Sequence, residues 1–371
     1  MTARPLRFGI IGCGAIGPTH AGAIRQLGHV VAAVADPIEQ RAAKVAERFE
    51  VECVCRDHVE LLKRADLDAV CVCTPSGMHA DHAVTALRAG RHVVIEKPMD
   101  ITPAACDRII DQAARSGKVL TVISQHRFDA ATQVARGLIQ AGQIGRIILA
   151  NADIRWFRTQ HYYDEGEWRG TWRLDGGGAL MNQGIHTLDL LQWLAGGVKK
   201  VWARTATAAH ERIEVEDIAV LSLEFGGGAI GSLVATTAAY DGFPNRIEIF
   251  GTEGSILIEG DNLRRVVLKS GQTFETQSAA EHALRVARGG TASVRDDAVE
   301  RTTAPPGAVW GDAHRAQIED FVLAIQGERT VLIDGSEGRA PVAVACAAYE
   351  SARTGREIIV DQSDAARPRG Q

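Results

Sequence analysis

The chain has 371 residues, of which 46% are hydrophobic and 23% charged, a composition typical of a folded globular protein rather than a disordered one. Its formal net charge of −5, with acidic and basic residues interspersed, makes nucleic acids and anionic membranes poor partners. The length exceeds one ordinary hydrophobic core and predicts two domains.

The N-terminus and the cysteines indicate a cytoplasmic protein without a membrane segment. The first apolar run is short and broken by glycines, so it is typical of a strand entering a turn, not of a signal peptide. There are seven cysteines, and two pairs have C-x-C spacing, Cys53 with Cys55 and Cys71 with Cys73. This spacing fits zinc poorly, so we predict buried structural thiols, no metal and a reducing compartment.

Short apolar segments alternate with helical ones up to about residue 125. The predicted strands are LRFGIIG, VVAAVAD, DAVCVCTP, HVVIEKP and VLTVISQHR, and helical periodicity fills the gaps between them. This alternation predicts a doubly wound parallel sheet of the Rossmann type, covered by helices on both faces. Right-handed crossovers place the carboxyl ends of all the strands at one edge, where ligands bind.

The pattern changes near residue 146, where longer alternating strands begin and helices become rare, except around 178–195. This predicts a second α/β domain on a large, mainly antiparallel open sheet, whose uncovered face favours a homodimer or homotetramer. We expect a long loop or weak hairpins over 270–310 and two late helices that can pack back on the first domain. The predicted boundaries are 1–125, 126–361 and a polar tail at 362–371.

A glycine motif lies between the first predicted strand and helix. The sequence Gly12-Cys13-Gly14-Ala15-Ile16-Gly17 fits G-x-G-x-x-G, and this context favours a dinucleotide site over a generic glycine turn. The helix N-terminus would face the pyrophosphate.

Asp36 ends the second predicted strand and favours NAD, because its carboxylate suits a ribose diol and repels a 2′-phosphate. Arg41, one turn later, leaves NADP open. The alternative is structural: Asp36 as N-cap, Pro37 at N1 and Glu39 at N3 would form a capping box.

The segment HVVIEKP places Glu96 and Lys97 at the cofactor edge of a buried strand, which Pro98 then ends. A lysine leaving an apolar run is costly unless it ends in a cleft, where it can hydrogen-bond a reacting oxygen. A surface lysine after a strand is the equally weighted alternative.

The stretch GGGALMNQGIH, residues 176–186, starts the predicted helix 179–194, on which Asn182, His186 and Asp189 share a face. Histidine is the natural base near neutral pH for removing a hydroxyl proton. The alternatives are a half-buried histidine among surface polar groups, or a metal held by His186 and Asp189.

The preceding segment, RTQHYYDEGEWRGTWRLD, is rich in aromatic and forked polar side chains, which suit the faces and hydroxyls of sugars. We select four candidates for substrate contact from it, Tyr163, Arg169, Trp172 and Asp175. A packing or interface loop is the alternative.

Taken together, GCGAIG, TPSGMH at 74–79, EKP at 96–98 and GGGALMNQGIHTLDLL at 176–191 resemble the Gfo/Idh/MocA oxidoreductases, which act mainly on sugars and cyclitols. The resemblance implies that Lys97 is catalytic and that a cis peptide can precede Pro98. It also places several residues near the nicotinamide or in the cofactor site, namely Thr74, Pro75, His79, Glu96 and Gln125. It further implies that His314 reaches the substrate pocket.

These features predict an NAD-dependent oxidoreductase acting on a secondary alcohol of a sugar, sugar derivative or cyclitol. In this hypothesis Lys97 orients the oxygen and His186 takes the proton. Asn182 stands where inositol-dehydrogenase-like members of the family have Asp, which favours pyranosides or nucleotide-linked sugars. Two alternatives stay open: an NAD-retaining glycosidase that oxidises C3 transiently, and a non-catalytic NAD-binding regulator.

Overall fold

The computed structural model describes the chain except residues 1–3, 272, 276–310 and 362–371, and its residues divide into two units. The first contains residues up to Gln125 together with α10 (Gly311–Ile325) and the start of α11 (Gly335–Thr354). The second begins at His126 and contains the remainder of α11. The predicted tail 362–371 and most of the predicted loop 270–310 lie outside the described residues.

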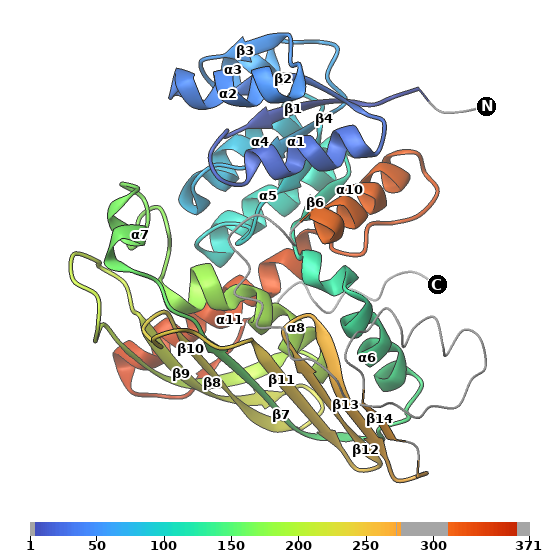
Figure 1. Ribbon diagram of the computed structural model, residues 1–371, viewed down its shortest axis with the longest axis vertical. Coiled ribbons are helices and arrows are strands. Elements are labelled where there is room, and N and C mark those ends of the chain that lie inside the picture. Colours follow the sequence, from blue (N-terminus) through green and yellow to red (C-terminus); the bar gives the residue numbers. More distant parts are fainter. Residues whose placement is uncertain (1–3, 272, 276–310, 362–371) are drawn as a thin grey trace. The chain divides into compact units, whose positions relative to one another are not determined.

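The first unit is built on a six-stranded sheet of order β3-β2-β1-β4-β5-β6, in which every described pairing is parallel (Figure 1). The strands are β1 (Arg7–Ile11), β2 (Val30–Ala35), β3 (Cys53–Cys55), β4 (Ala69–Val72), β5 (His92–Ile95) and β6 (Leu120–Val122). The helices between them are α1 (Gly17–Gln26), α2 (Glu39–Phe49), α3 (His58–Leu62), α4 (His79–Arg88) and α5 (Pro103–Ser116). This strand order is that of the Rossmann fold, and it confirms the predicted doubly wound parallel sheet.

Helix α10 completes the core of this unit from far along the chain. Ile318 and Phe321 of α10 are buried with Phe8 and Ile10 of β1 and Ile24 of α1. Burying each such side chain stabilises the fold by about 1.5–3 kcal/mol, so α10 is an integral part of the first unit.

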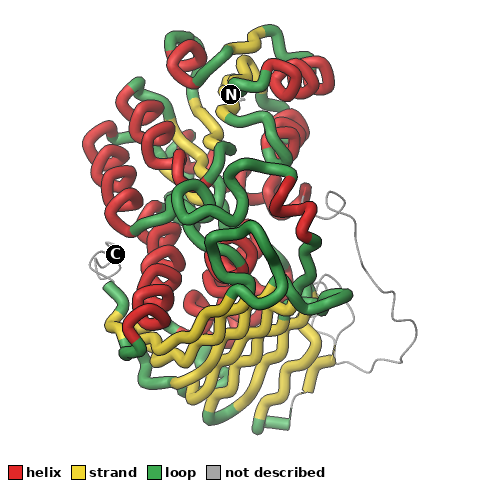
Figure 2. Tube along the Cα trace, turned by 90° about the vertical axis from the view of Figure 1, so that its left-hand side faces the viewer, coloured by secondary structure: helices red, strands yellow, loops and turns green. Residues whose placement is uncertain are grey.

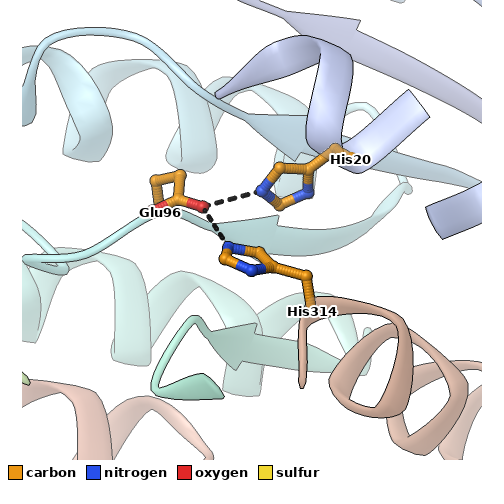
Figure 3. A group of neighbouring side chains, drawn as sticks. All are labelled: His20, Glu96 and His314. Carbon is orange, nitrogen blue, oxygen red and sulfur yellow. Dashed lines mark hydrogen bonds and ion pairs between the residues drawn. The ribbon is translucent and has the colours of Figure 1, made fainter. Parts of the chain in front are cut away.

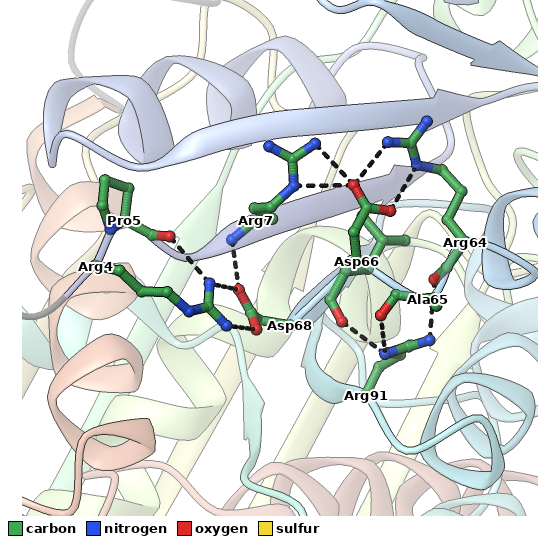
Figure 4. Close-up of polar contacts among 9 residues, drawn as sticks. Arg4, Pro5, Arg7, Arg64, Ala65, Asp66, Asp68 and Arg91 are labelled. Carbon is green, nitrogen blue, oxygen red and sulfur yellow. Dashed lines mark hydrogen bonds and ion pairs between the residues drawn. The ribbon is translucent and has the colours of Figure 1, made fainter.

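Arginine–carboxylate contacts hold the start of β1 beside the residues that precede β4 (Figure 4). Asp68 accepts hydrogen bonds from the Arg4 guanidinium at 2.6 and 2.8 Å and from the backbone N–H of Arg7 at 2.8 Å. Arg91 donates to the carbonyls of Arg64 and Leu67 at 2.9 and 2.7 Å. The cluster therefore stabilises the edge of the sheet opposite the carboxyl ends of the strands.

The second unit is built on a nine-stranded sheet of order β14-β13-β12-β11-β7-β10-β9-β8-β15, whose strands lie side by side in Figure 2. The strands are β7 (Ile147–Arg155), β8 (Val198–Ala206), β9 (Ile218–Phe225), β10 (Ile230–Thr236), β11 (Arg246–Gly251), β12 (Gly254–Glu259), β13 (Asn262–Leu268), β14 (Thr273–Glu275) and β15 (Ile358–Ile359). Among the described strands of this sheet only β7 and β10 pair in parallel, so the prediction of a mainly antiparallel sheet is confirmed. The strands β3, β13 and β15 were not predicted, whereas β14, which pairs antiparallel with β13, falls in the region predicted as a long loop or weak hairpins.

One face of this sheet carries helices and the other has exposed apolar side chains. Helix α8 (Ile185–Ala195) packs on β7 and β11, and α6 (Ala130–Gln140) packs on β12 and β13. Trp202, Val220 and Ile230 remain exposed. None of the described helices is long and apolar enough to cross a membrane.

Candidate active site

The glycine motif forms a tight turn between β1 and α1. Gly12 has a φ of +98°, and a Cβ there would lie 2.5 Å from the carbonyl oxygen of Cys73. A Cβ on Gly17 would lie 2.5 Å from the carbonyl oxygen of Gly12, whereas one on Gly14 would meet no described atom within 4 Å. The first and third glycines are therefore needed for close packing, and the second leaves open the space where a pyrophosphate would approach the backbone.

Asp36 braces this turn with both carboxylate oxygens. Oδ2 accepts from the Cys13 N–H at 2.8 Å, and Oδ1 accepts from the Ile38 N–H at 2.8 Å. Helix α2 begins at Glu39 with Ile38 as its N-cap, so the capping box with Asp36 as N-cap is not formed. Each oxygen retains a second lone pair that a ribose hydroxyl can use.

Replacing Asp36 by Asn is expected to weaken NAD binding about 10- to 100-fold, because a hydrogen bond to a charged group contributes about 1.5–3 kcal/mol. Binding of NADP should weaken less or improve, because the charge that repels a 2′-phosphate is gone. Titrating both cofactors by nicotinamide fluorescence measures this. Glu47→Gln on α2 is the matched charge control, and an equal loss for both cofactors in D36N would contradict the assignment.

The loops that follow β4 and β5 are tied together by His79. Its Nδ1 lies 2.8 Å from the carbonyl oxygen of Pro98, and its Nε2 lies 2.8 Å from that of Thr74. The Thr74 hydroxyl lies 3.0 Å from His82 Nδ1. Thr74, Pro75 and His79 thus lie at the carboxyl edge of the sheet, with the ring of His79 enclosed.

Lys97 follows β5 at the same edge, and its peptide bond to Pro98 is cis. Glu96 is buried: its Oε1 accepts from His20 Nε2 at 2.8 Å and lies 3.4 Å from His314 Nε2 (Figure 3). Its Oε2 accepts from the backbone N–H of Lys97 at 3.1 Å. His314, predicted to reach the substrate, is 1% exposed and sits against Glu96.

A buried amide oxygen adds to the cofactor edge. The Oε1 atom of Gln125 is enclosed and has no hydrogen-bond partner among the described residues. An acceptor of this kind suits an N–H or O–H donor of a ligand. The Gln125 oxygen, the glycine turn and Asp36 together make the first unit compatible with a bound dinucleotide.

In the second unit, close contacts with two other segments require glycine at two of the three positions 176–178. A Cβ on Gly177 would lie 2.0 Å from the Tyr349 hydroxyl, and one on Gly178 would lie 1.9 Å from the Glu216 carbonyl oxygen. The Glu216 carboxylate accepts from the N–H groups of Gly178 and Leu180 at 3.0 and 2.8 Å. Burial raises the pKa of Glu216, partly offset by these hydrogen bonds. Sequence reasoning missed Glu216 and Tyr349.

The helix after these glycines starts with a π-helical turn, Ala179–Gly184, and becomes α-helical only at Ile185. The predicted uniform α-helix 179–194 is therefore wrong at its start. A Cβ on Gly184 would lie 3.0 Å from the Ala179 carbonyl oxygen, so glycine permits the wider turn. Asn182 and His186 thus come from a π turn and an α-helix, not from successive turns of one α-helix.

Asn182 belongs to a buried polar network. Its Nδ2 donates to Asp175 Oδ1 at 2.6 Å, and its Oδ1 accepts from Gln183 Nε2 at 3.0 Å. Asp175 Oδ2 accepts from the Gly170 N–H at 2.9 Å, and Arg158 donates to Gln183 Oε1 at 2.8 Å. These partners fix the orientation of the Asn182 amide beside a carboxylate that is 1% exposed.

His186 is 7% exposed and lines a pocket of the second unit. The ring of His126 stands edge-on to it, with ring centroids 5.2 Å apart, and His126 Nδ1 lies 2.7 Å from Asp129 Oδ2. Burial raises the pKa of Asp261, also in this pocket, and His126 partly offsets the rise. The remaining pocket residues are Thr132, Thr187, Leu190, Asn245, Ile247, Ile258 and Gly260.

Asp189, the suggested metal partner of His186, forms a buried ion pair with Arg127 at 2.6 and 2.8 Å. The Arg127 guanidinium also stacks on the Trp193 ring, 5.0 Å from its centroid. A carboxylate engaged at both oxygens by arginine is a poor metal ligand, which disfavours the metal alternative.

In the aromatic segment before the glycines, some side chains pack against the second unit and others are exposed to solvent. The Tyr163 hydroxyl lies 2.8 Å from Thr237 Oγ1, and the Arg169 guanidinium stacks 4.3 Å from the centroid of Tyr162. Trp172 is 45% exposed, with its ring edge-on to Tyr349. Of these candidates, Trp172 has the most surface available to a ligand, and all of them remain proposals.

A Rossmann unit with a dinucleotide cradle, followed by a sheet unit carrying a buried histidine, defines a two-domain NAD-binding oxidoreductase. Residues 6–124 match the model of the oxidoreductase family with an NAD-binding Rossmann fold, and residues 132–257 match that of the GFO/IDH/MocA C-terminal domain. The chain therefore belongs to the Gfo/Idh/MocA family.

Three similar proteins illustrate the range of substrates. The WlbA dehydrogenase from Bordetella pertussis, solved with NADH and UDP-GlcNAcA, is 31% identical with a TM-score of 0.83 over 97% of this chain and 99% of that one. D-glucoside 3-dehydrogenase of Escherichia coli is 28% identical over 96% of this chain and 98% of its own length. Myo-inositol 2-dehydrogenase of Thermotoga maritima is 28% identical over 71% of this chain and 77% of its own length.

Proposed function

We propose that the protein is an NAD-dependent dehydrogenase that oxidises a secondary alcohol of a pyranoside or a nucleotide-linked pyranose. The observation that carries the proposal is the cofactor cradle with Lys97 at the carboxyl edge of the same sheet. Its support also includes the similarity to enzymes named for sugars and cyclitols.

Bound NAD would supply the hydride acceptor. In the proposed reaction Lys97 donates a hydrogen bond to the substrate oxygen and orients it. His186 takes the hydroxyl proton, and the carboxyl groups of Asp129 and Asp261, which line the same pocket, are placed to compensate the charge that it gains. Asn182 donates to Asp175 and accepts from Gln183, and as an amide it brings no charge to the site.

The substrate class is proposed from Asn182 and from the relatives. The family resemblance implies a carboxylate at this position in inositol-dehydrogenase-like members, whereas here an amide donates to the buried carboxylate of Asp175. We also propose that the exposed apolar face of the nine-stranded sheet, including Trp202, Val220 and Ile230, is buried in a homodimer or homotetramer.

The test is a panel of pyranosides, nucleotide-linked pyranoses and cyclitols with NAD, followed by nicotinamide absorbance. Net NADH formation on a pyranose, with weaker turnover of cyclitols, is the expected result. Release of an aglycone without net NADH would instead show the NAD-retaining glycosidase. Tight NAD binding without turnover on any compound would favour the non-catalytic regulator.

A further inference from the structure

Three side chains from distant parts of the first unit meet in its interior. His20 comes from α1, Glu96 directly follows β5 and His314 comes from α10 (Figure 3). Their exposed fractions are 0%, 6% and 1%. One carboxylate oxygen, Oε1, faces both histidine Nε2 atoms, at 2.8 Å from His20 and 3.4 Å from His314.

The other carboxylate oxygen reaches the backbone of the next residue. Glu96 Oε2 accepts the N–H of Lys97 at 3.1 Å, so the carboxylate joins both histidines to the main chain of the lysine. His20 lies in the first turns of α1, whose first residue, Gly17, is the last glycine of the motif. The contacts thus run from the helix of the dinucleotide cradle to the strand end that carries Lys97.

We propose that His20, Glu96 and His314 form a buried positioning relay that holds the backbone of Lys97 in its reactive place. The inference rests on the proposed function, because it assigns Lys97 as the residue that orients the substrate oxygen. In this proposal the three residues act through the backbone of Lys97, because their side chains are buried against one another and Glu96 Oε2 accepts the Lys97 N–H. A misplacement of about 1 Å at a reacting group can cost about 10²-fold in rate, so a positioning defect is measurable.

The charge of Glu96 is essential to this arrangement. Burial alone would raise the pKa of its carboxyl group, but the hydrogen bond from His20 and the adjacent His314 imidazole outweigh that and hold the pKa well below its ordinary value. An ionised carboxylate offers acceptors at both oxygens, and donors face both. A glutamine would turn an NH₂ group toward either the histidines or the Lys97 N–H and break one side of the relay.

The experiment compares Glu96→Gln, His20→Leu and His20→Gln in the full-length protein. E96Q and H20L are each expected to lower kcat at least about 10-fold, while KM for NAD stays within about threefold. H20Q keeps an N–H donor for Glu96 and should retain kcat within about threefold of the parent chain. The matched control is Asp320→Asn, which removes a buried charge on α10 that accepts from the Leu332 N–H and should leave kcat unchanged.

Thermal unfolding of each variant shows whether it is folded. A fall in kcat with an unchanged KM for NAD distinguishes a positioning defect from a general loss of structure. Equal turnover of H20L and H20Q would overturn the relay, as would a loss in D320N equal to that in E96Q. The side chains of His20, Glu96 and His314 are also close enough to one another to hold a metal ion. One zinc per chain by elemental analysis, lost in H20Q, would therefore overturn the relay as well. If Lys97→Met leaves kcat unchanged, the proposed function is rejected. If K97M is inactive but E96Q keeps the kcat of the parent chain, only the relay is rejected.

Discussion

Replacing Lys97 by methionine is expected to lower kcat by about 10²- to 10⁴-fold, the usual contribution of a positioned proton donor or acceptor. Methionine has similar length and apolar bulk but provides no N–H, so the substrate oxygen loses its orienting hydrogen bond. NAD binding should stay within a few fold, because the glycine turn and Asp36 are untouched. Steady-state kinetics on the best sugar of the panel, with NAD titration by fluorescence, measures both effects.

The control for this variant is Lys63→Met, which removes an exposed lysine at the end of α3 in the same unit. It should leave both kcat and cofactor affinity at the level of the parent chain. Turnover by K97M within threefold of K63M would reject Lys97 as the orienting residue. A parallel loss of NAD binding and turnover would assign Lys97 to the cofactor instead.

Five of the six strands of the first unit could be predicted from the sequence, because the information that specifies them is local. Each βα step carries an apolar run followed by helical periodicity, and the glycine motif occupies a short contiguous stretch. The edge where Lys97 lies follows from the same rule, since parallel strands end together. In the second unit, alternation predicted most strands but not β13, whose LRRVVL segment departs from strict alternation.

The parts that sequence reasoning missed depend on contacts between distant residues. Glu216 meets Gly178 across 38 residues, and His20 meets Glu96 across 76. Neither contact has a signature in the spacing of either partner. The π turn at Ala179–Gly184 is another such case, because it is set by Gly184 and by neighbours that only the fold provides. In the sequence His20 lies at helical spacing between Ile16 and Ile24, and this apolar setting gives no sign of a carboxylate partner.

Replacing Asn182 by aspartate is expected to make the stability of the second unit depend strongly on pH. The new carboxylate would take the place of an amide that donates to Asp175 Oδ1 at 2.6 Å, beside a side chain that is 1% exposed. Two buried carboxylates at this distance cannot both ionise without repulsion, so the folded state would retain a shared proton.

The direction of this pH dependence follows from the number of protons bound by the folded and the unfolded state. Below the ordinary carboxyl range both states are protonated and N182D should be nearly as stable as the parent chain. As pH rises, the unfolded state loses the proton first, so stability falls by about 1.4 kcal/mol for every unit by which the folded pair's titration is raised. Thermal unfolding from pH 4 to 8 would show a midpoint that declines relative to that of the parent chain.

The double substitution D175N/N182D separates charge from shape, because it exchanges the amide and the carboxylate and restores one donor facing one acceptor. It should recover most of the lost stability at pH 8 and remove the added pH dependence. If N182D alone unfolds with the same pH dependence as the parent chain, the contact with Asp175 does not explain why this position carries an amide. If the double variant recovers stability, the buried charge of Asp175 is what selects asparagine over aspartate at position 182.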